Sequence, residues 1–164
     1  MIKKLALLLG IAIFFVACGS QQTVKKDEGT ATVAASGDVV KQLAGEWEAE
    51  ELGAVLAQYG FALPAKFTFT EDGKYVWEFT KGGALFVAEG KYVLVDASSK
   101  PYKIDFIQEK TGKKGEALAE VKMESAGIFD FEGGKLKTIF YNKKFLPRPE
   151  EFGDNDTQWY KKVK

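Results

Sequence analysis

The chain has 164 residues, and its 23 basic and 23 acidic side chains give a formal net charge of zero. This balance offers no basic surface for nucleic acid, so no nucleic-acid partner is predicted. The sequence contains no histidine, which excludes Ser-His-Asp and Cys-His catalysis and the usual zinc sites.

Residues 1–17 have the order of a bacterial export signal. Met1 to Lys4 is a short positive start, Leu5 to Val16 carries no charge, and the small residues Ala17 and Gly19 lie where cleavage occurs. An apolar helix of this length reaches about 18 Å, which is less than the roughly 30 Å of a bilayer core. The segment is therefore predicted to direct export and to be removed.

Cys18 is the only cysteine. Phe15-Val16-Ala17-Cys18 resembles the lipobox of bacterial lipoproteins, although Leu is the common residue where Phe15 stands. The resemblance implies that Cys18 begins the mature chain, carries a diacylglyceryl group on its sulfur and is acylated, for example by palmitate, on its amino group. Each buried CH₂ contributes about 0.8 kcal/mol, so several acyl chains hold a protein on a membrane. The alternative is an ordinary signal peptide with an incidental cysteine.

Residues 18–38 are predicted to consist of the lipidated Cys18 and a flexible tether. The stretch has no aromatic residue and little that could fill a core. About 20 such residues give a root-mean-square reach near 25 Å. Gly19 follows Cys18 directly, and resemblance to Gram-negative lipoproteins then implies the outer membrane if the host is Gram-negative. We therefore expect the membrane as a partner and a lipid-anchored location in the cell envelope.

The remaining residues, 39–164, are predicted to form one domain. Val39 to Ala44 is an apolar lead-in of about one helical turn. Gly45 to Glu50 alternates in polarity and predicts a half-buried strand. Leu52 to Tyr59 has apolar residues at the spacing of one helical face, which predicts one short helix after the first strand, ended by Gly60.

From Lys66 onward the sequence alternates between strand and turn. Asp72-Gly73 is a strong hairpin signal, Gly90 predicts a bend or bulge inside a strand, and Lys110 to Gly115 is predicted to be a polar turn. Further turns are expected at Gly82-Gly83 and Gly133-Gly134. The predicted strands cover residues 66–70, 75–79, 85–95, 102–107, 117–123, 127–131, 136–141 and 158–163.

This pattern predicts an all-β fold, a single antiparallel lipocalin-like β-barrel of about eight strands. Short connections without long crossovers favour an up-and-down barrel, and closing the ring removes exposed edges. An open sandwich is the alternative. Eight strands leave an interior just wide enough for side chains or one small ligand.

Several short motifs carry a family resemblance across residues 43–163. Leu43-Ala44-Gly45-Glu46-Trp47 resembles the Leu-x-Gly-x-Trp start of lipocalin-like domains. The rest is similar to a family of uncharacterised bacterial lipocalin-like domains first noticed in planctomycetes, through Gly90-Lys91-Tyr92, Pro101-Tyr102-Lys103-Ile104-Asp105, Gly127-Ile128-Phe129, Gly133-Gly134-Lys135-Leu136 and Arg148-Pro149-Glu150-Glu151-Phe152. Gly134 stands where the family usually has Asp, and Phe129 replaces Tyr. The resemblance implies a barrel and no activity.

Two groups of residues are candidates for ligand binding. Arg148, the only arginine, would either clamp an anionic ligand or tie a long loop across one barrel end, and we favour the second interpretation. The aromatic candidates would either line an apolar calyx or fill the core, and filling by most of them is favoured; they are Trp47, Tyr75, Trp77, Phe79, Tyr92, Phe106, Phe129 and Trp159. Trp47 is also expected to take Lys161 or Lys162 over its ring at the closing strand.

No catalytic residue, metal site or cofactor is predicted, and we expect no enzymatic activity. The carboxylates considered for acid–base chemistry are better explained as solvated side chains; they are Glu48, Glu50, Glu78, Asp105 and Asp130. The leading hypothesis is a non-enzymatic binder of a small apolar or amphipathic molecule. The alternative is a structural or protein-interaction lipoprotein with a filled barrel, and a third is an inhibitor or chaperone acting through residues 142–156.

Overall fold

A computed structural model describes residues 37–164 of the chain. The predicted export signal, the predicted lipidation site Cys18 and all but two residues of the predicted tether lie outside the described residues. Within them, no helix is long and apolar enough to cross a membrane.

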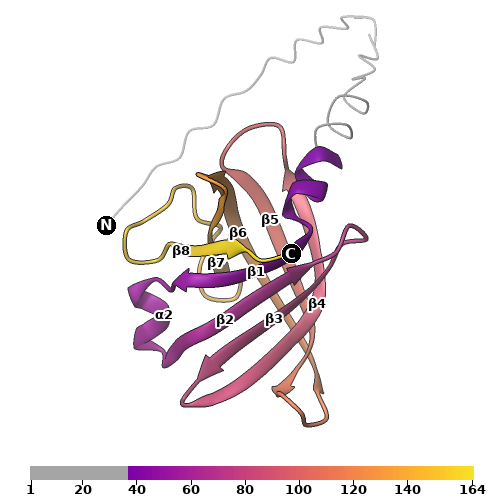
Figure 1. Cartoon of the computed structure of the whole chain (residues 1–164), viewed down its shortest axis with the longest axis vertical. Coiled ribbons are helices and arrows are strands. Elements are labelled where there is room, and N and C mark those ends of the chain that lie inside the picture. The colour runs from indigo at the N-terminus through magenta and orange to yellow at the C-terminus, as the bar shows by residue number, and fades with distance from the viewer. Residues whose placement is uncertain (1–36) are drawn as a thin grey trace, which may run out of the picture.

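Eight antiparallel strands form one closed barrel, in which each strand pairs with the next and β8 pairs with β1 (Figure 1). This confirms the predicted all-β barrel and rules out the open sandwich. The strands are β1 Gly45–Glu51, β2 Phe61–Phe69, β3 Lys74–Lys81, β4 Ala84–Asp96, β5 Tyr102–Lys113, β6 Ala119–Glu132, β7 Lys135–Asn142 and β8 Gln158–Lys162.

Short helices lie on either side of β1. Residues 37–43 are helical, and they extend the turn predicted at the start of the domain. The helix α2, Ala54–Gln58, is the short helix predicted after the first strand. None of its residues is fully buried, and Tyr59, which follows it, is 69% exposed. The backbone holds this end of the barrel instead, through a 3.1 Å bond from Val55 N to Asn155 O.

The strands β5 and β6 are longer than the sequence predicted. The two strands expected at 117–123 and 127–131 are one strand, because Ser125 pairs with Phe106 and Ala126 with Asp105. The turn expected from Lys110 to Gly115 was also wrong, since β5 continues to Lys113 and pairs with β4. A partner strand on both sides supplies backbone hydrogen bonds, which override the weak strand propensity of polar residues.

The predicted irregularity at Gly90 is confirmed as a register shift between β4 and β5, at Glu89 and Gly90. The backbone of β5 comes so close that a Cβ atom on Gly90 would lie 2.0 Å from Ile107 O. No real Cβ contact is that short, so this position requires glycine. The bulge thus lets β4 bend around the barrel.

We expect Gly90→Ala to lower the free energy of unfolding by about 2–3 kcal/mol, since a backbone must shift to admit the methyl group. Chemical denaturation of the purified protein measures this loss. The matched control is Gly153→Ala, where a Cβ would meet nothing within 4 Å, and stability should stay within about 0.5 kcal/mol. Equal stability of the two variants would contradict the close approach at Gly90.

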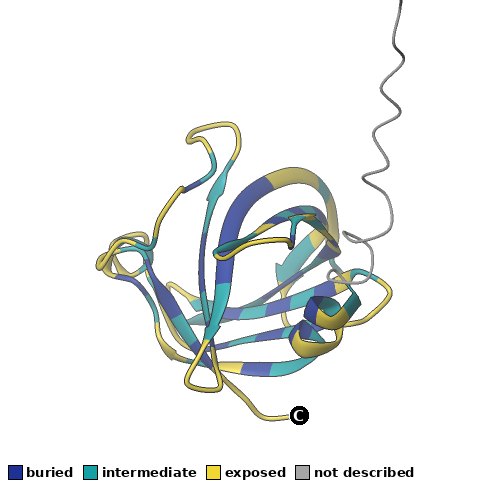
Figure 2. Cartoon of the chain, turned by 90° about the horizontal axis from the view of Figure 1, so that it is seen from above, coloured by how far each residue is buried: buried dark blue, intermediate teal, exposed yellow. Residues whose placement is uncertain are grey.

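Burial alternates along the strands and places the core inside the ring (Figure 2). On β3, Tyr75, Trp77 and Phe79 are buried while the residues between them are partly exposed. This matches the face predicted from the sequence. Inward-facing aromatic residues from the other strands complete the same cluster.

Candidate functional site

The barrel interior is packed with aromatic rings around Phe67. Its side chain is fully buried, and its ring centroid lies 5.1 to 6.3 Å from those of six other aromatic residues, Phe69, Tyr75, Trp77, Phe106, Phe140 and Tyr160. Separations of this size are those of favourable stacked and edge-to-face pairs. Five strands, β2, β3, β5, β7 and β8, therefore meet through one ring.

A narrow crevice reaches into this cluster and has a volume of about 20 Å³. A single water molecule needs about 10–15 Å³ by this measure, so the crevice has room for little more than one water. Its lining consists of Phe67, Tyr75, Trp77, Phe106, Gln108, Met123, Ser125 and Phe140. Three of the predicted candidates, Tyr75, Trp77 and Phe106, thus come together here, and Phe79 stacks on Trp77 with centroids 4.2 Å apart.

Trp47 lies away from the crevice, where β1 meets β8. Its Nε1 donates to Leu43 O at 2.7 Å, which ties the first helix to the barrel. Lys162 Nζ lies 5.1 Å from the centre of the Trp47 ring and donates to Gln42 O at 3.0 Å. The predicted cation–π contact is therefore confirmed with Lys162, and it belongs to barrel closure.

Tyr92 and Phe129 also lie outside the crevice lining. The hydroxyl of Tyr92 donates to Thr70 O at 2.7 Å and fixes the β2–β3 turn. Phe129 packs against Tyr102 and Phe131. The predicted aromatic candidates are thus core residues with one exception, and they do not converge on one site. The exception is Trp159, which is half-buried, alternates with the inward-facing Gln158 and Tyr160 on β8, and has Lys137 Nζ 4.9 Å from its ring centre.

Polar side chains inside the barrel were missed by the sequence reasoning. The fully buried Tyr160 donates its hydroxyl to Gln158 Oε1 at 2.8 Å. Both residues lie on the same face of β8, and period-two alternation along that strand is the signal that could have found them. Nearby, Trp77 Nε1 is buried without a hydrogen-bond partner among the described residues. Burial raises the pKa of the Tyr160 hydroxyl, and Trp77 Nε1 lies close enough to oppose this rise. Trp77 Nε1 nevertheless makes no hydrogen bond with good geometry to that hydroxyl.

Two less buried tyrosines also resist ionisation. Burial, with help from Asp72 and Glu71, raises the pKa of Tyr92 to about 12. Burial also raises the pKa of Tyr141 to about 12, together with the hydrogen bond that its hydroxyl donates to Asp156. Both phenols therefore stay neutral in the folded protein at pH values where an unfolded chain would lose their protons.

Because these pKa values are higher in the folded state than the ordinary 10, folding stability should hold below pH 10 and fall as the pH rises toward 12. Denaturant titrations across this range measure the fall. Deprotonation of lysines also lowers the stability in this range, so the wild type is compared with Tyr92→Phe. The stability of this variant should decline less steeply with pH than that of the wild type. Identical slopes would show that Tyr92 does not contribute.

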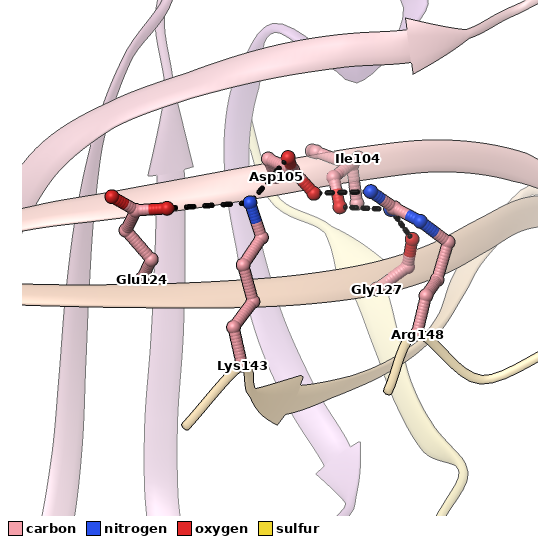
Figure 3. Close-up of polar contacts among 6 residues, drawn as sticks. All are labelled: Ile104, Asp105, Glu124, Gly127, Lys143 and Arg148. Carbon is pink, nitrogen blue, oxygen red and sulfur yellow. Dashed lines mark hydrogen bonds and ion pairs between the residues drawn. The ribbon is translucent and has the colours of Figure 1, made fainter. Parts of the chain in front are cut away.

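Arg148 lies outside the barrel, against the wall formed by β5 and β6 (Figure 3). One guanidinium nitrogen donates to Ile104 O and to Gly127 O, each at 2.7 Å, and the other donates to the carboxylate of Asp105. These are contacts within the chain, of the kind expected if Arg148 ties down a loop. The planar fork of arginine suits such a site because it reaches three acceptors at once.

Lys143 makes a second attachment beside Arg148. Its ammonium lies 2.8 Å from Asp105 Oδ2 and 3.4 Å from Glu124 Oε2 (Figure 3). The hydrogen bond to Asp105 raises the pKa of Lys143. One carboxylate thus receives both cations, and the segment that follows β7 is held to the wall at two points.

This segment covers an apolar patch on the outer wall. Ile128 and Ile139 pair across β6 and β7 and are almost fully buried, yet they alternate with the inward-facing Phe129 and Phe140. Ile128 lies under Pro149, in an outer groove of about 500 Å³ lined by Ser99, Lys100, Pro101, Lys103, Ile128, Arg148, Pro149 and Glu150. The barrel therefore packs side chains on both faces of β6.

We expect Arg148→Lys to lower the free energy of unfolding by about 1–3 kcal/mol, because an ammonium cannot reach all three acceptors. Denaturant unfolding gives this value. The control is Lys103→Met, which removes an exposed pair with Asp96 and should cost less than about 1 kcal/mol. An Arg148→Lys variant as stable as the control would contradict the attachment.

The carboxylates considered for acid–base work do not form a catalytic pair with one another. Glu48 is exposed, and most of the others make ion pairs with lysines, such as Glu78 with Lys114 at 2.7 Å and Asp130 with Lys100 at 2.6 Å. Glu50 pairs with Lys135. Within residues 37–164, no group of three or more acidic, cysteine or histidine side chains is placed to hold a metal ion.

No protein-family model matches the chain, and neither curated proteins nor solved structures give a significant match. The resemblance to the planctomycete-type lipocalin-like domains therefore stays a prediction. The closed eight-stranded barrel is established by the pairing of its strands alone.

Proposed function

We propose that this protein is a lipid-anchored, non-enzymatic component of a bacterial cell envelope, whose barrel acts through its outer surface. The observation that carries this proposal is the filled interior. A pocket for a small organic ligand usually has about 300–1,000 Å³, whereas the crevice that enters the barrel has about 20 Å³. The larger hollows, such as the groove of about 500 Å³ beside Arg148, lie on the outer wall.

The anchor in this proposal rests on the sequence. Cys18 follows a positive start and a charge-free run, at the position where lipidation of a bacterial lipoprotein occurs. A barrel tethered in this way can meet partners in the envelope without leaving the membrane. The proposed role is structural or interactive, with no covalent chemistry assigned to the barrel.

Metabolic labelling of producing cells with an alkyne analogue of palmitate tests the anchor. We expect the wild-type protein to incorporate the label and Cys18→Ser to incorporate none, because the sulfur and the new amino group are both lost as acylation sites. Western blots of the same samples control for the amount of protein. Equal labelling of the two chains would show that the anchor has been assigned wrongly.

Native mass spectrometry of the lipidated protein after exposure to envelope lipid extract tests the filled barrel. We expect only the mass of the covalently acylated chain. Trp77→Ala, which opens a cavity beside Phe67, serves as the positive control for detecting a bound lipid. A saturable one-to-one adduct of the wild type that disappears in Ser125→Val, which narrows the crevice, would overturn the proposal.

A second candidate is the binding of a small apolar or amphipathic molecule inside the barrel. The observation that favours it is Trp77 Nε1, a buried donor without a partner among the described residues, in the wall of the crevice. A ligand with one acceptor oxygen would satisfy that donor, provided that the surrounding rings move apart. The adduct described above is the result that would select this candidate.

A further inference from the structure

The most exposed large apolar side chain of the described residues is Phe145, which is 72% exposed. Leu146 beside it is 50% exposed, and Met123 on the neighbouring β6 is 37% exposed. Three large apolar groups therefore face solvent around the turn that follows β7. We refer to residues 142–147 as the Asn142 turn.

The backbone fixes the conformation of the Asn142 turn. Asn142 O accepts hydrogen bonds from Phe145 N at 3.0 Å and Leu146 N at 3.1 Å. The side chain of Asn142 accepts a third, from Lys144 N at 2.8 Å. On one side Lys143 N donates to Glu124 O, and Arg148 anchors the other side. The turn thus presents Phe145 and Leu146 outward on a rigid support.

Positive charge surrounds these apolar groups. Lys122, Lys143 and Lys144 line a surface hollow of about 360 Å³ with Met123, Asn142 and Glu124, the single acidic residue in that lining. Lys143 already binds Glu124 and Asp105. Lys122 and Lys144 make no ion pair with another described residue, and Lys144 Nζ lies 5.7 Å from the Phe145 ring. The hollow therefore carries an excess of positive charge.

Exposed aromatic and aliphatic side chains flanked by lysines are typical of segments that lie at a membrane interface. The apolar groups enter the boundary between headgroups and acyl chains, and each lysine near an anionic surface adds electrostatic attraction. The long lysine stems let the ammonium groups remain in the headgroup layer. This chemistry fits an anionic lipid surface better than it fits a neutral protein surface.

The length of chain between the predicted anchor and the barrel permits this contact. Residues 18 and 37 are 19 positions apart in the sequence, which corresponds to at most roughly 63–68 Å of extended chain. The longest strand, β6, has 14 residues and is about 46 Å long if fully extended. The anchor can therefore reach a bilayer that lies against any face of the barrel.

We propose that the Asn142 turn, with Lys122 and Met123, is the face with which the barrel rests on an anionic lipid bilayer. Phe145 and Leu146 insert at the interface, and Lys122 and Lys144 contact the headgroups. This inference rests on the membrane anchoring in the proposed function, and it adds the orientation of the barrel. A protein partner at the same turn is the competing outcome.

Site-specific fluorescence in vesicles tests the orientation with the mature, lipidated chain. Cys18 is acylated in that chain, so Phe145→Cys provides the single free thiol for the fluorophore NBD. The control label is at Ala62→Cys, an exposed position on β2, which lies four strands from β6 around the ring. Vesicles of phosphatidylcholine with phosphatidylglycerol carry nitroxide-labelled lipids as quenchers, and flotation reports attachment separately.

We expect at least threefold stronger quenching at position 145 than at position 62, with a blue-shifted emission at 145 only. The difference should shrink in pure phosphatidylcholine, at high salt, and when Lys122→Glu and Lys144→Glu are combined. Two results would overturn the orientation and leave the anchor intact. In the first, the protein floats with the vesicles while the fluorophore at position 145 remains in water; in the second, quenching is equal at positions 145 and 62. Protection of position 145 only by added envelope proteins would overturn the orientation in favour of a protein partner, and a chain that does not float would refute both anchor and orientation.

Discussion

Everything in this fold depends on the closure of the ring by the five residues of β8. This strand pairs with β7 on one side and β1 on the other, and without it both neighbours would be open sheet edges that attract other chains. Because so few backbone hydrogen bonds close the ring, side chains reinforce it. Trp47 is held between Leu43 and Lys162, and Tyr160 packs against Phe67 in the core.

Side chains fill most of the interior of this barrel. An eight-stranded ring can hold either side chains or one small ligand, and the choice depends on the size of the inward-facing residues. Here β2, β3, β5 and β7 each turn large rings toward Phe67, and the rings occupy the space that a ligand would need. The features that remain for recognition, grooves and exposed apolar groups with lysines, lie outside.

The sequence predicted this fold well wherever local patterns decide the structure. Alternation at Tyr75, Trp77 and Phe79 identified an inward face, and Gly90 identified the bulge, because both features depend on nearby residues. The predictions failed where distant segments decide. The break expected within β6 does not occur, since pairing with β5 and β7 carries the strand through. Ile128 and Ile139 lie on the outer face yet are buried, because the segment after β7 folds back over them, and no local pattern contains that information.

The same limit applies to the candidate site. Composition singled out Arg148 as the only arginine, but its acceptors come from β5 and β6, more than 20 residues away in the chain. All of the aromatic candidates except Trp159 were right as core residues, yet the sequence could not tell that only some of them line the crevice. Gln158 and Tyr160 were missed although the alternation along β8 places both on the inward face, where their hydrogen bond joins residues only two positions apart.

Asp105 has a consequence for how this surface tolerates change. Its two carboxylate oxygens serve Lys143 and Arg148 separately, so the two cations share one counter-ion. Loss of either cation leaves the carboxylate free to shift toward the other, and their energetic effects are therefore coupled. A change of the acid itself removes one contact from both cations at once, and it leaves Lys143 with Glu124 and Arg148 with the carbonyl oxygens of Ile104 and Gly127.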